Sequence, residues 1–384
     1  MSTVGMVLGI ILMLSLYGGM NFFIGRRIFQ FLRFPFPHLN GKVFAGIYIV
    51  LALSLMIGIL PLPPEIKAIM SWIGSYWMGI FVYLLILLLV AELVILLGRL
   101  IKVIPRPIPK SIRFYKGAIV LLLTIGLVSY GMYNANQIKQ VSYEIQTKES
   151  TMATEMKIVM ISDLHLGAVN SEKHLESIVQ GINNLDPDLV CLVGDVFNDD
   201  FNAIRNPDRA IELLKSIKAT YGVYSSLGNH DGGNTFNEMT SFLQESNIKL
   251  LNDEYEIIDE RLVLFGRVDP TPIGGFGDLK RKDTKDIMKT VASLHTNMPV
   301  VMMDHNPANI EEYGNEVDLI ISGHTHKGQI FPGNLITNAL YIVDYGHYQK
   351  DAESPHVIVS SGVGTWAMPM RIGSNSEIVS ISLR

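Results

Sequence analysis

The sequence predicts a two-part chain of the α/β (α+β) class: a bundle of about four transmembrane helices, followed by two packed β-sheets with helices outside. Three observations predict it. The apolar residues, 48% of the 384, are concentrated in the first third of the chain. The remainder alternates short apolar strands with amphipathic segments and then becomes strand-rich, a pattern typical of layered α/β folds. Finally, five of those strands end in carboxylate, amide or imidazole side chains.

The first part of the chain, residues 1–140, is predicted to be a membrane anchor. Its apolar stretches are each roughly long enough to cross the hydrocarbon core of a bilayer, with tilt in the third. A cleavable signal peptide fits poorly, because no basic region precedes the first stretch and further stretches follow. The four predicted spans are Val4–Ile24, Val43–Leu60, Met70–Leu97 and Gly117–Tyr133.

Basic residues predict how this anchor is oriented. Ten Lys and Arg residues lie between spans one and two and between spans three and four, whereas Pro61–Ala68 carries only Lys67. By the positive-inside rule both basic connections are cytoplasmic, so everything after span four is extracytoplasmic. The protein is therefore expected to be a multi-pass protein of the cell membrane. The basic loops also suit anionic lipid head groups, although topology alone explains them. Glu92, inside span three, is either a functional carboxylate or a solvated one near the interface.

The second part is predicted to consist of a linker, residues 141–152, and a soluble domain, residues 153–384. The whole chain is mildly acidic, with 31 Lys and Arg against 36 Asp and Glu, and this charge balance disfavours a nucleic-acid partner. The expected helices are Glu172–Asn184, Pro207–Lys218, Phe236–Glu245, Thr284–Leu294 and Pro307–Tyr313. The expected strands are Lys157–Ser162, Leu189–Gly194, Gly222–Leu227, Leu262–Gly266, Pro299–Met303, Leu319–Ser322, Leu340–Asp344, Val357–Ser361 and Glu377–Leu383.

Polar side chains of metal-ligand type follow five of these strands. Taken singly, a turn Asn, a capping Asp or a core His is the commoner explanation. Side chains at the carboxyl ends of neighbouring strands converge on one crevice, however, and five in series argue for a shared site. The residues are Asp163 and His165, then Asp195, then Asn229, His230 and Asp231, then His305, and then His324 and His326.

These residues can be assembled into a binuclear metal site. Asp163 and His165, two apart in extended backbone, are expected to point to the same side. Asp195, after a glycine, is the natural bridge between the two ions, and a tight turn at Thr325 would aim its neighbouring histidines at different ions. Carboxylate, amide and imidazole donors fit Mn, Fe, Zn or Co. The predicted ligands are Asp163, His165, Asp195 and His326 for one ion, and Asp195, Asn229, His305 and His324 for the other.

Such a pair of ions predicts hydrolysis of phosphate esters, because a bridging hydroxide attacks phosphorus while the ions neutralise the charge. His230 is expected to protonate the leaving alkoxide, with Asp231 orienting its ring. The alternative for His230 is a third ligand or a surface histidine.

These motifs resemble those of the calcineurin-like metallophosphoesterase superfamily. The resemblance covers the soluble part, in the family's order, and implies a two-sheet αββα sandwich, the ligands above and His230 as the leaving-group acid. With its fused apolar segment, the chain is similar to the membrane-anchored bacterial branch of YkuE- and YkoQ-like proteins and to transmembrane metallophosphoesterases. Two positions depart from the family pattern: Asn198 replaces a usual Asp, with Asp199 and Asp200 just after it, and Lys327 replaces a frequent Gly.

The resulting prediction is a membrane-anchored phosphohydrolase acting on a phosphomonoester or phosphodiester, with a phosphorylated lipid or lipid-linked head group as a plausible substrate. The alternatives are a phosphatase on soluble extracytoplasmic esters, a non-catalytic membrane sensor or scaffold and, with thin support, a transporter. Candidate contacts to substrate phosphate are Arg267, Lys327, Gln329 and His347.

Overall fold

The computed structural model describes residues 3–58, 60, 62–147, 155–170, 172–294 and 297–384. The chain divides into two compact units, residues 1–130 and 131–384. Each unit has its own hydrophobic core.

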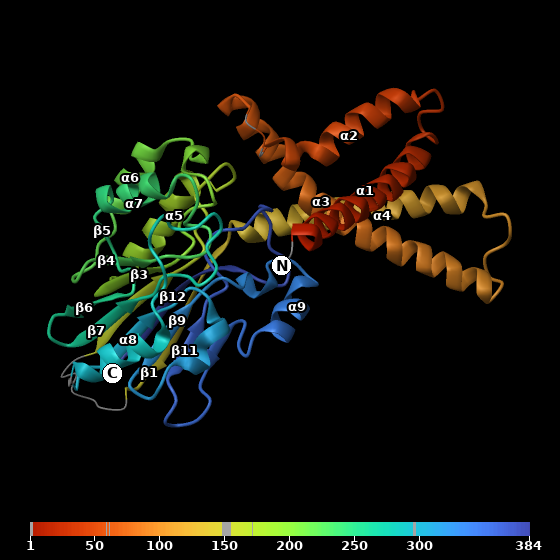
Figure 1. The fold of residues 1–384 in the computed structure, drawn as a ribbon. Helices are drawn as coiled ribbons and strands as arrows, with labels where there is room; N and C mark the ends of the chain where they lie inside the picture. The colour runs from red at the N-terminus through yellow and green to blue at the C-terminus, as the bar shows by residue number, and fades with distance from the viewer. Residues whose placement is uncertain (1–2, 59, 61, 148–154, 171, 295–296) are drawn as a thin grey trace. The chain divides into compact units, whose positions relative to one another are not determined.

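The first unit is helical, as the sequence predicts. Four helices in the described residues are long and apolar enough to cross a membrane (Figure 1). Each overlaps one expected span and extends beyond it at one or both ends, except that the second stops before Leu60. The helices are α1 (Thr3–Leu32), α2 (Gly41–Gly58), α3 (Pro64–Leu100) and α4 (Lys110–Ala135), the last of which ends in the second unit.

The described residues of the second unit form two six-stranded sheets, so the predicted two-sheet architecture is confirmed. The first sheet has the order β1-β12-β2-β3-β4-β5, in which β2 to β5 are parallel. Its strands are β1 (Ile138–Ile145), β2 (Met156–Ile161), β3 (Leu189–Val193), β4 (Val223–Ser226), β5 (Ile248–Leu250) and β12 (Ser376–Leu383). The second sheet has the order β10-β11-β9-β8-β7-β6. Its strands are β6 (Glu254–Ile258), β7 (Leu262–Gly266), β8 (Val300–Met303), β9 (Leu319–Ser322), β10 (Gly346–Tyr348) and β11 (His356–Val359).

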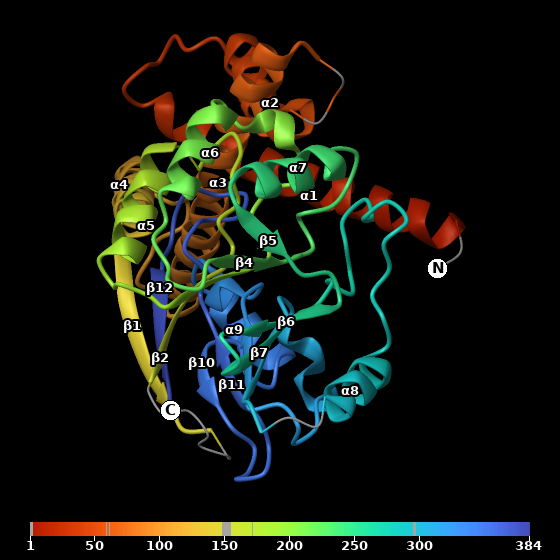
Figure 2. The same cartoon turned by 90° about the vertical axis from the view of Figure 1, so that its left-hand side faces the viewer.

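The two sheets bury apolar side chains against each other, and helices cover their outer faces. Ile158, Leu264 and Ile321 belong to the shared core, together with the fully buried Cys191. Both faces of the central strands are thus buried, which explains their continuous apolar runs. The first sheet is covered by α5 (Glu172–Asn183), α6 (Pro207–Lys215) and α7 (Phe236–Glu245), and the second by α8 (Thr284–Ser293) (Figure 2).

Two sequence predictions are wrong in this unit. The expected linker begins inside a strand, because residues 141–145 pair with β12 in parallel register as part of β1; residues 148–152 of that linker lie outside the described residues. Leu340–Asp344 is not a strand: Leu340 ends α9 (Gly333–Leu340), and Leu340 and Ile342 are 74% and 51% exposed. Their apolar side chains lie on the surface rather than inside a sheet.

Strand β1 is predicted to be essential to the soluble unit. A fragment starting at residue 131 retains β1, whereas one starting at 155 leaves β12 as an unprotected apolar edge strand and loses the buried Ile145. We expect the shorter fragment to be less stable by several kcal/mol, on the order of one lost strand of core contacts, and to aggregate. Urea unfolding of both fragments measures this, and equal midpoints would contradict it.

Candidate metal centre

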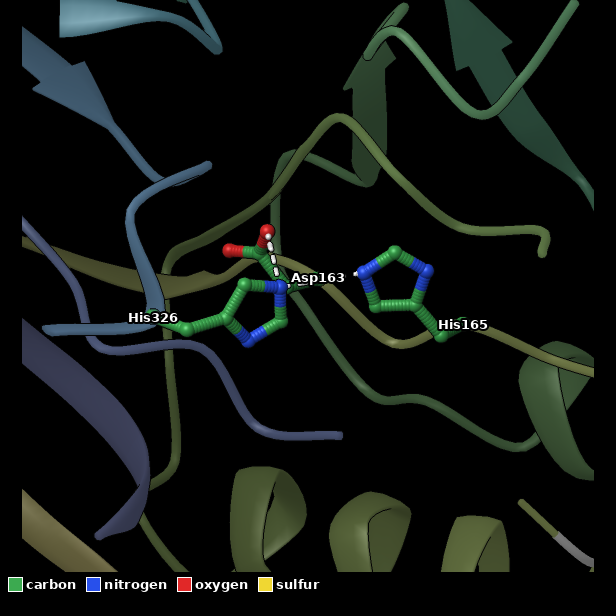
Figure 3. A group of neighbouring side chains, drawn as sticks. All are labelled: Asp163, His165 and His326. Atoms are coloured by element: carbon green, nitrogen blue, oxygen red, sulfur yellow. Dashed lines mark hydrogen bonds and ion pairs between the residues drawn. The ribbon is translucent and has the colours of Figure 1, made fainter. Parts of the chain in front are cut away.

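The predicted ligands come from five strand ends, three in the first sheet and two in the second. One group consists of Asp163 and His165 after β2 and His326 after β9 (Figure 3). The Nε2 atom of His326 lies 3.3 Å from Asp163 Oδ1 and 3.1 Å from Nε2 of His165. All three residues are buried.

A second group consists of Asp195 after β3, His305 after β8 and His324 after β9. Asp195 Oδ2 lies 3.1 Å from His305 Nε2 and 3.7 Å from His165 Nε2, so this carboxylate stands between the two groups. The Oδ1 atom of Asn229, after β4, lies 2.8 Å from His324 Nδ1. The structure therefore brings all seven predicted ligands together, and His324 and His326 point into different groups.

Unusual backbone geometry achieves this convergence. Asp163, His165, Asp195, His324 and His326 have φ angles of 55°, 48°, 53°, 71° and 50°. This left-handed region costs a non-glycine residue roughly 1–2 kcal/mol, and such strain is concentrated at functional sites. The expectation that Asp163 and His165 lie in extended backbone is wrong, because the chain turns sharply where β2 ends; both side chains nevertheless join one group.

The two groups fit divalent metal ions. Two imidazole nitrogens bound at 2.0–2.1 Å to a common ion are about 2.9–3.4 Å apart for angles between 90° and tetrahedral, and His165 and His326 meet this condition. His305 supplies a second test. Its Nδ1 lies 2.8 Å from the carbonyl oxygen of Val193, which requires an N–H there, so in the neutral ring its Nε2 presents a lone pair toward the Asp195 carboxylate. Two acceptors face each other, and a cation between them satisfies both.

The electrostatics of the site favour the metal-binding protonation states of several histidines. Burial lowers the pKa of His165 to about 3 and that of His324 to about 4, and it lowers the pKa of His326 well below its usual value. These imidazoles are therefore neutral at pH 7, the form that binds metals. Burial opposes the charges of both Asp195 and His305, but each shifts the other's pKa toward the charged form: the pKa of the Asp195 carboxyl is lowered and that of His305 is raised well above its usual value, so this pair favours a positive charge between its two atoms.

His230 is oriented by a different carboxylate from the one expected. The Nδ1 atom of its ring lies 2.7 Å from Asp199 Oδ1. Asp231 instead accepts backbone N–H groups: its Oδ2 accepts from Asp195 and Gly228, and its Oδ1 from Phe197. The expectation that Asp231 orients His230 is thus corrected, because both of its oxygens fix the loop that carries Asp195. The only sequence signal for Asp199 is its place beside Asn198, where the family pattern has an acidic residue.

Sequence reasoning also missed Arg371, which is fully buried behind the first group. Its guanidinium donates to the carbonyl oxygens of Gly362 and Gly364, and its Nη2 lies 3.4 Å from His326 Nδ1. Its Nη1 donates to the backbone oxygen of His326 at 3.5 Å, so the guanidinium supports the turn that carries this ligand. No motif marks Arg371, since its partners are mostly backbone carbonyl groups.

The expected phosphate contacts are not supported as a set. Arg267 is fully buried and paired with Asp253 at 2.6 Å, and Gln329 is engaged with the backbone of Trp366 and Met368, so both have structural roles. The Nε2 atom of His347, on β10, lies 2.9 Å from Nδ1 of His356, on β11. Lys327 stacks its ammonium over the Tyr345 ring at 3.9 Å, directly after His326.

Known proteins share sequence similarity with the segment that forms this site. Residues 156–328, which include all seven candidate ligands, match the model of the calcineurin-like phosphoesterase family. An uncharacterized metallophosphoesterase of Campylobacter jejuni is 31% identical over 274 residues, covering 69% of this chain and 68% of that protein. The chain belongs to the calcineurin-like phosphoesterase family. It is accordingly a metal-dependent phosphoesterase, as the motifs predict.

Two further relatives agree with the predicted branch of this family. A transmembrane protein with metallophosphoesterase domain from Danio rerio is 29% identical over 332 residues, covering 82% of this chain and 74% of its own length. The uncharacterized metallophosphoesterase YkuE of Bacillus subtilis is 26% identical, covering 71% of this chain and 96% of its own. The match to the Danio rerio protein is longer than the 156–328 segment that the family model matches.

Each group is predicted to bind one ion. Elemental analysis of the purified protein is expected to find about two first-row divalent ions per chain. His326→Ala removes one of the three side chains of the first group and should reduce this number by about one, with a large loss of hydrolysis. His347→Ala, a histidine outside both groups, is the matched control. Unchanged metal content in His326→Ala would contradict the assignment.

Proposed function

We propose that the protein hydrolyses a phosphate ester of a membrane lipid or lipid-linked head group, at the bilayer surface and outside the cytoplasm. The two ions would be held by Asp163, His165 and His326 and by Asp195, Asn229, His305 and His324, with Asp195 between them. When bound, they supply a nucleophilic water and neutralise the charge of the phosphate.

In this proposal His230 delivers the proton to the departing alkoxide oxygen. Its backbone N–H donates to Asp195 Oδ1 at 2.8 Å, which fixes the residue against the cluster, and Asp199 holds its ring. Burial alone would lower the pKa of His230, but the hydrogen bond to Asp199 raises it above its usual value. Asp199 therefore favours the imidazolium, which is the form that a general acid requires.

One observation carries the lipid part of the proposal: an exposed apolar surface borders the cluster. We call it the α9 patch, and its members are Phe331, Leu335, Ile336, Leu340, Ile342 and Trp366, each at least 45% exposed. The Trp366 ring centroid lies 5.8 Å from that of His230. Exposed apolar side chains gathered in neighbouring segments of this kind mark an interaction site, and lipid is an occupant that matches their chemistry.

The position of the α9 patch favours the bilayer as its occupant. The last turn of the fourth apolar helix belongs to the soluble unit, where the Asn134 amide donates to the carbonyl oxygens of Arg371 and Ser374. The same segment pairs with the start of the patch, since Phe331 donates its N–H to the carbonyl oxygen of Ile372 at 2.7 Å. If α4 spans the membrane, the patch lies beside its exit point.

The patch is also tied to the ligands. Thr337 of α9 donates its hydroxyl to Asp344 Oδ2, and Thr325 donates to the backbone oxygen of Asp344 at 2.6 Å. Thr325 stands between His324 and His326. Docking of α9 on a bilayer would therefore bring the cluster to the head-group layer, where lipid phosphates lie.

The apolar patch is predicted to separate lipid substrates from soluble ones. Leu335→Ser with Ile336→Ser should lower the hydrolysis of a phosphorylated lipid in vesicles by roughly 10- to 100-fold, since each side chain contributes about 1.5–3 kcal/mol when fully buried. Hydrolysis of p-nitrophenyl phosphate should change less than about two-fold. Ile257→Ser on β6, which replaces a 46% exposed residue at the opposite edge of the second sheet, is the control.

Equal losses on both substrates would count against docking. Wild-type preference for the soluble ester in the same vesicles would favour a phosphatase of soluble extracytoplasmic esters.

The role of His230 predicts a pH effect of Asp199→Asn. Loss of the carboxylate removes the interaction that raises the pKa of His230, so the imidazolium loses its proton at a lower pH. The alkaline limb of the plot of kcat against pH should therefore move to lower pH. His230→Asn should lose about 100-fold or more in kcat on an ester with a poor leaving group and far less on p-nitrophenyl phosphate, whose phenolate needs little protonation. Asp200→Asn, in the same loop, controls for the loss of a nearby charge. A plot of kcat against pH that is unchanged in Asp199→Asn would refute the pairing of His230 with Asp199.

A further inference from the structure

The helical unit contains a large cavity that includes none of the candidate metal ligands. It has a volume of about 1190 Å³ and is formed by residues of α1, α3 and α4 and of the loops after α1 and α3. All of its lining residues lie between Arg27 and Gly117, within the first unit. Along α3 it extends from Arg99 to Leu88, about 16 Å at the rise of an α-helix.

The charges that line this cavity are unbalanced. Glu92 is its single carboxylate, and Arg27 and Lys116 both pair with it, at 2.8 and 2.7 Å. Four further cations line the cavity: Arg33, Arg99, Lys110 and Arg113. The Nε atoms of Arg27 and Arg99 are buried and have no hydrogen-bond partner. Arg33, Lys110 and Arg113 are exposed, so the cost of burial falls on those two Nε atoms; the excess of positive charge around them calls for an anion.

The other wall of the cavity is apolar, which narrows the class of anion. Its lining includes Phe31, Phe34, Leu88, Ile95, Leu96 and Ile108. An inorganic ion would leave this surface without a partner, whereas a phospholipid supplies a phosphate for the cations and hydrocarbon for the rings and aliphatic side chains. Topology alone explains why the loops are basic, but it does not explain why six of their cations converge on one cavity with a hydrophobic wall.

We propose that this cavity binds the phosphate head group of an anionic phospholipid from the leaflet next to the basic loops. By the positive-inside rule this is the cytoplasmic leaflet, on the other side of the membrane from the proposed site of hydrolysis. Glu92 acts as an internal competitor, because it holds two cations that the lipid phosphate would otherwise contact. The ligand is bound and not hydrolysed, and the inference does not depend on the reaction proposed above.

The test is native mass spectrometry of the full-length protein with phosphatidylglycerol or phosphatidylcholine. The wild type should retain phosphatidylglycerol at least about 10-fold more tightly. Arg99→Gln with Arg113→Gln should abolish most of this preference. Lys102→Gln with Arg106→Gln removes the same charge from the connection between α3 and α4, at residues that do not line the cavity, and should retain the preference.

Glu92→Gln distinguishes a binding role from a structural one, because freeing Arg27 and Lys116 should strengthen phosphatidylglycerol binding, whereas loss of a purely structural ion pair would not. Equal losses in both double variants would overturn the proposal by showing general charge attraction. Protection of the protein against thermal unfolding by glycerol 3-phosphate as strong as that by phosphatidylglycerol would overturn the assignment to a lipid.

Discussion

The buried carboxylate of Asp195 is the constraint on which the catalytic unit depends. A carboxylate removed from water must be compensated by hydrogen bonds or by positive charge. Asp195 Oδ1 accepts the backbone N–H of His230, and Oδ2 faces the imidazoles of His305 and His165. Because these partners follow strands of both sheets, this one group links the two halves of the sandwich. A shared cation is the partner that satisfies Asp195 and His305 together.

The surrounding protein holds this arrangement against its own strain. Five of the seven ligands occupy left-handed backbone, and the three loops that carry these five are fixed by polar groups from elsewhere. Asp231 holds the Asp195 loop, Arg371 holds His326, and the Asn170 amide donates to the carbonyl oxygens of Leu164 and His165. Gly194 completes the design, since a side chain there would collide with the His305 ring. These hydrogen bonds offset the backbone strain, although the groups that make them take no part in the reaction.

Much of this could be predicted from the sequence, and the failures have physical causes. The central strands were predictable because burial on both faces produces continuous apolar runs such as Leu189–Val193. The ligands were predictable because they directly follow those runs. Strand β1 was missed because its exposed positions make it read as a polar linker, and only its pairing with β12 reveals it. The apolar run Leu340–Asp344 was misread because periodicity does not distinguish a strand from a surface patch. Asp199 and Arg371 act on histidines distant in the sequence, His230 and His326; the place of Asp199 beside Asn198 is its only local signal, and Arg371 has none.

Under the two proposals, the chain would contact lipid at two places. The α9 patch would present the metal centre to one face of the bilayer, and the basic cavity would hold an anionic head group at the other. Both proposals rest on exposed or buried groups that the packing of a soluble phosphatase would not require. Together they give the apolar helices a role beyond simple retention at the membrane.

The most direct test of the central claim is anomalous X-ray diffraction from crystals of the purified protein, measured at the absorption edges of first-row metals. The account predicts two anomalous peaks, one between Asp163, His165 and His326 and the other between Asp195, His305 and His324. Crystals of active protein with no peak at these residues, or with peaks only elsewhere, would contradict it.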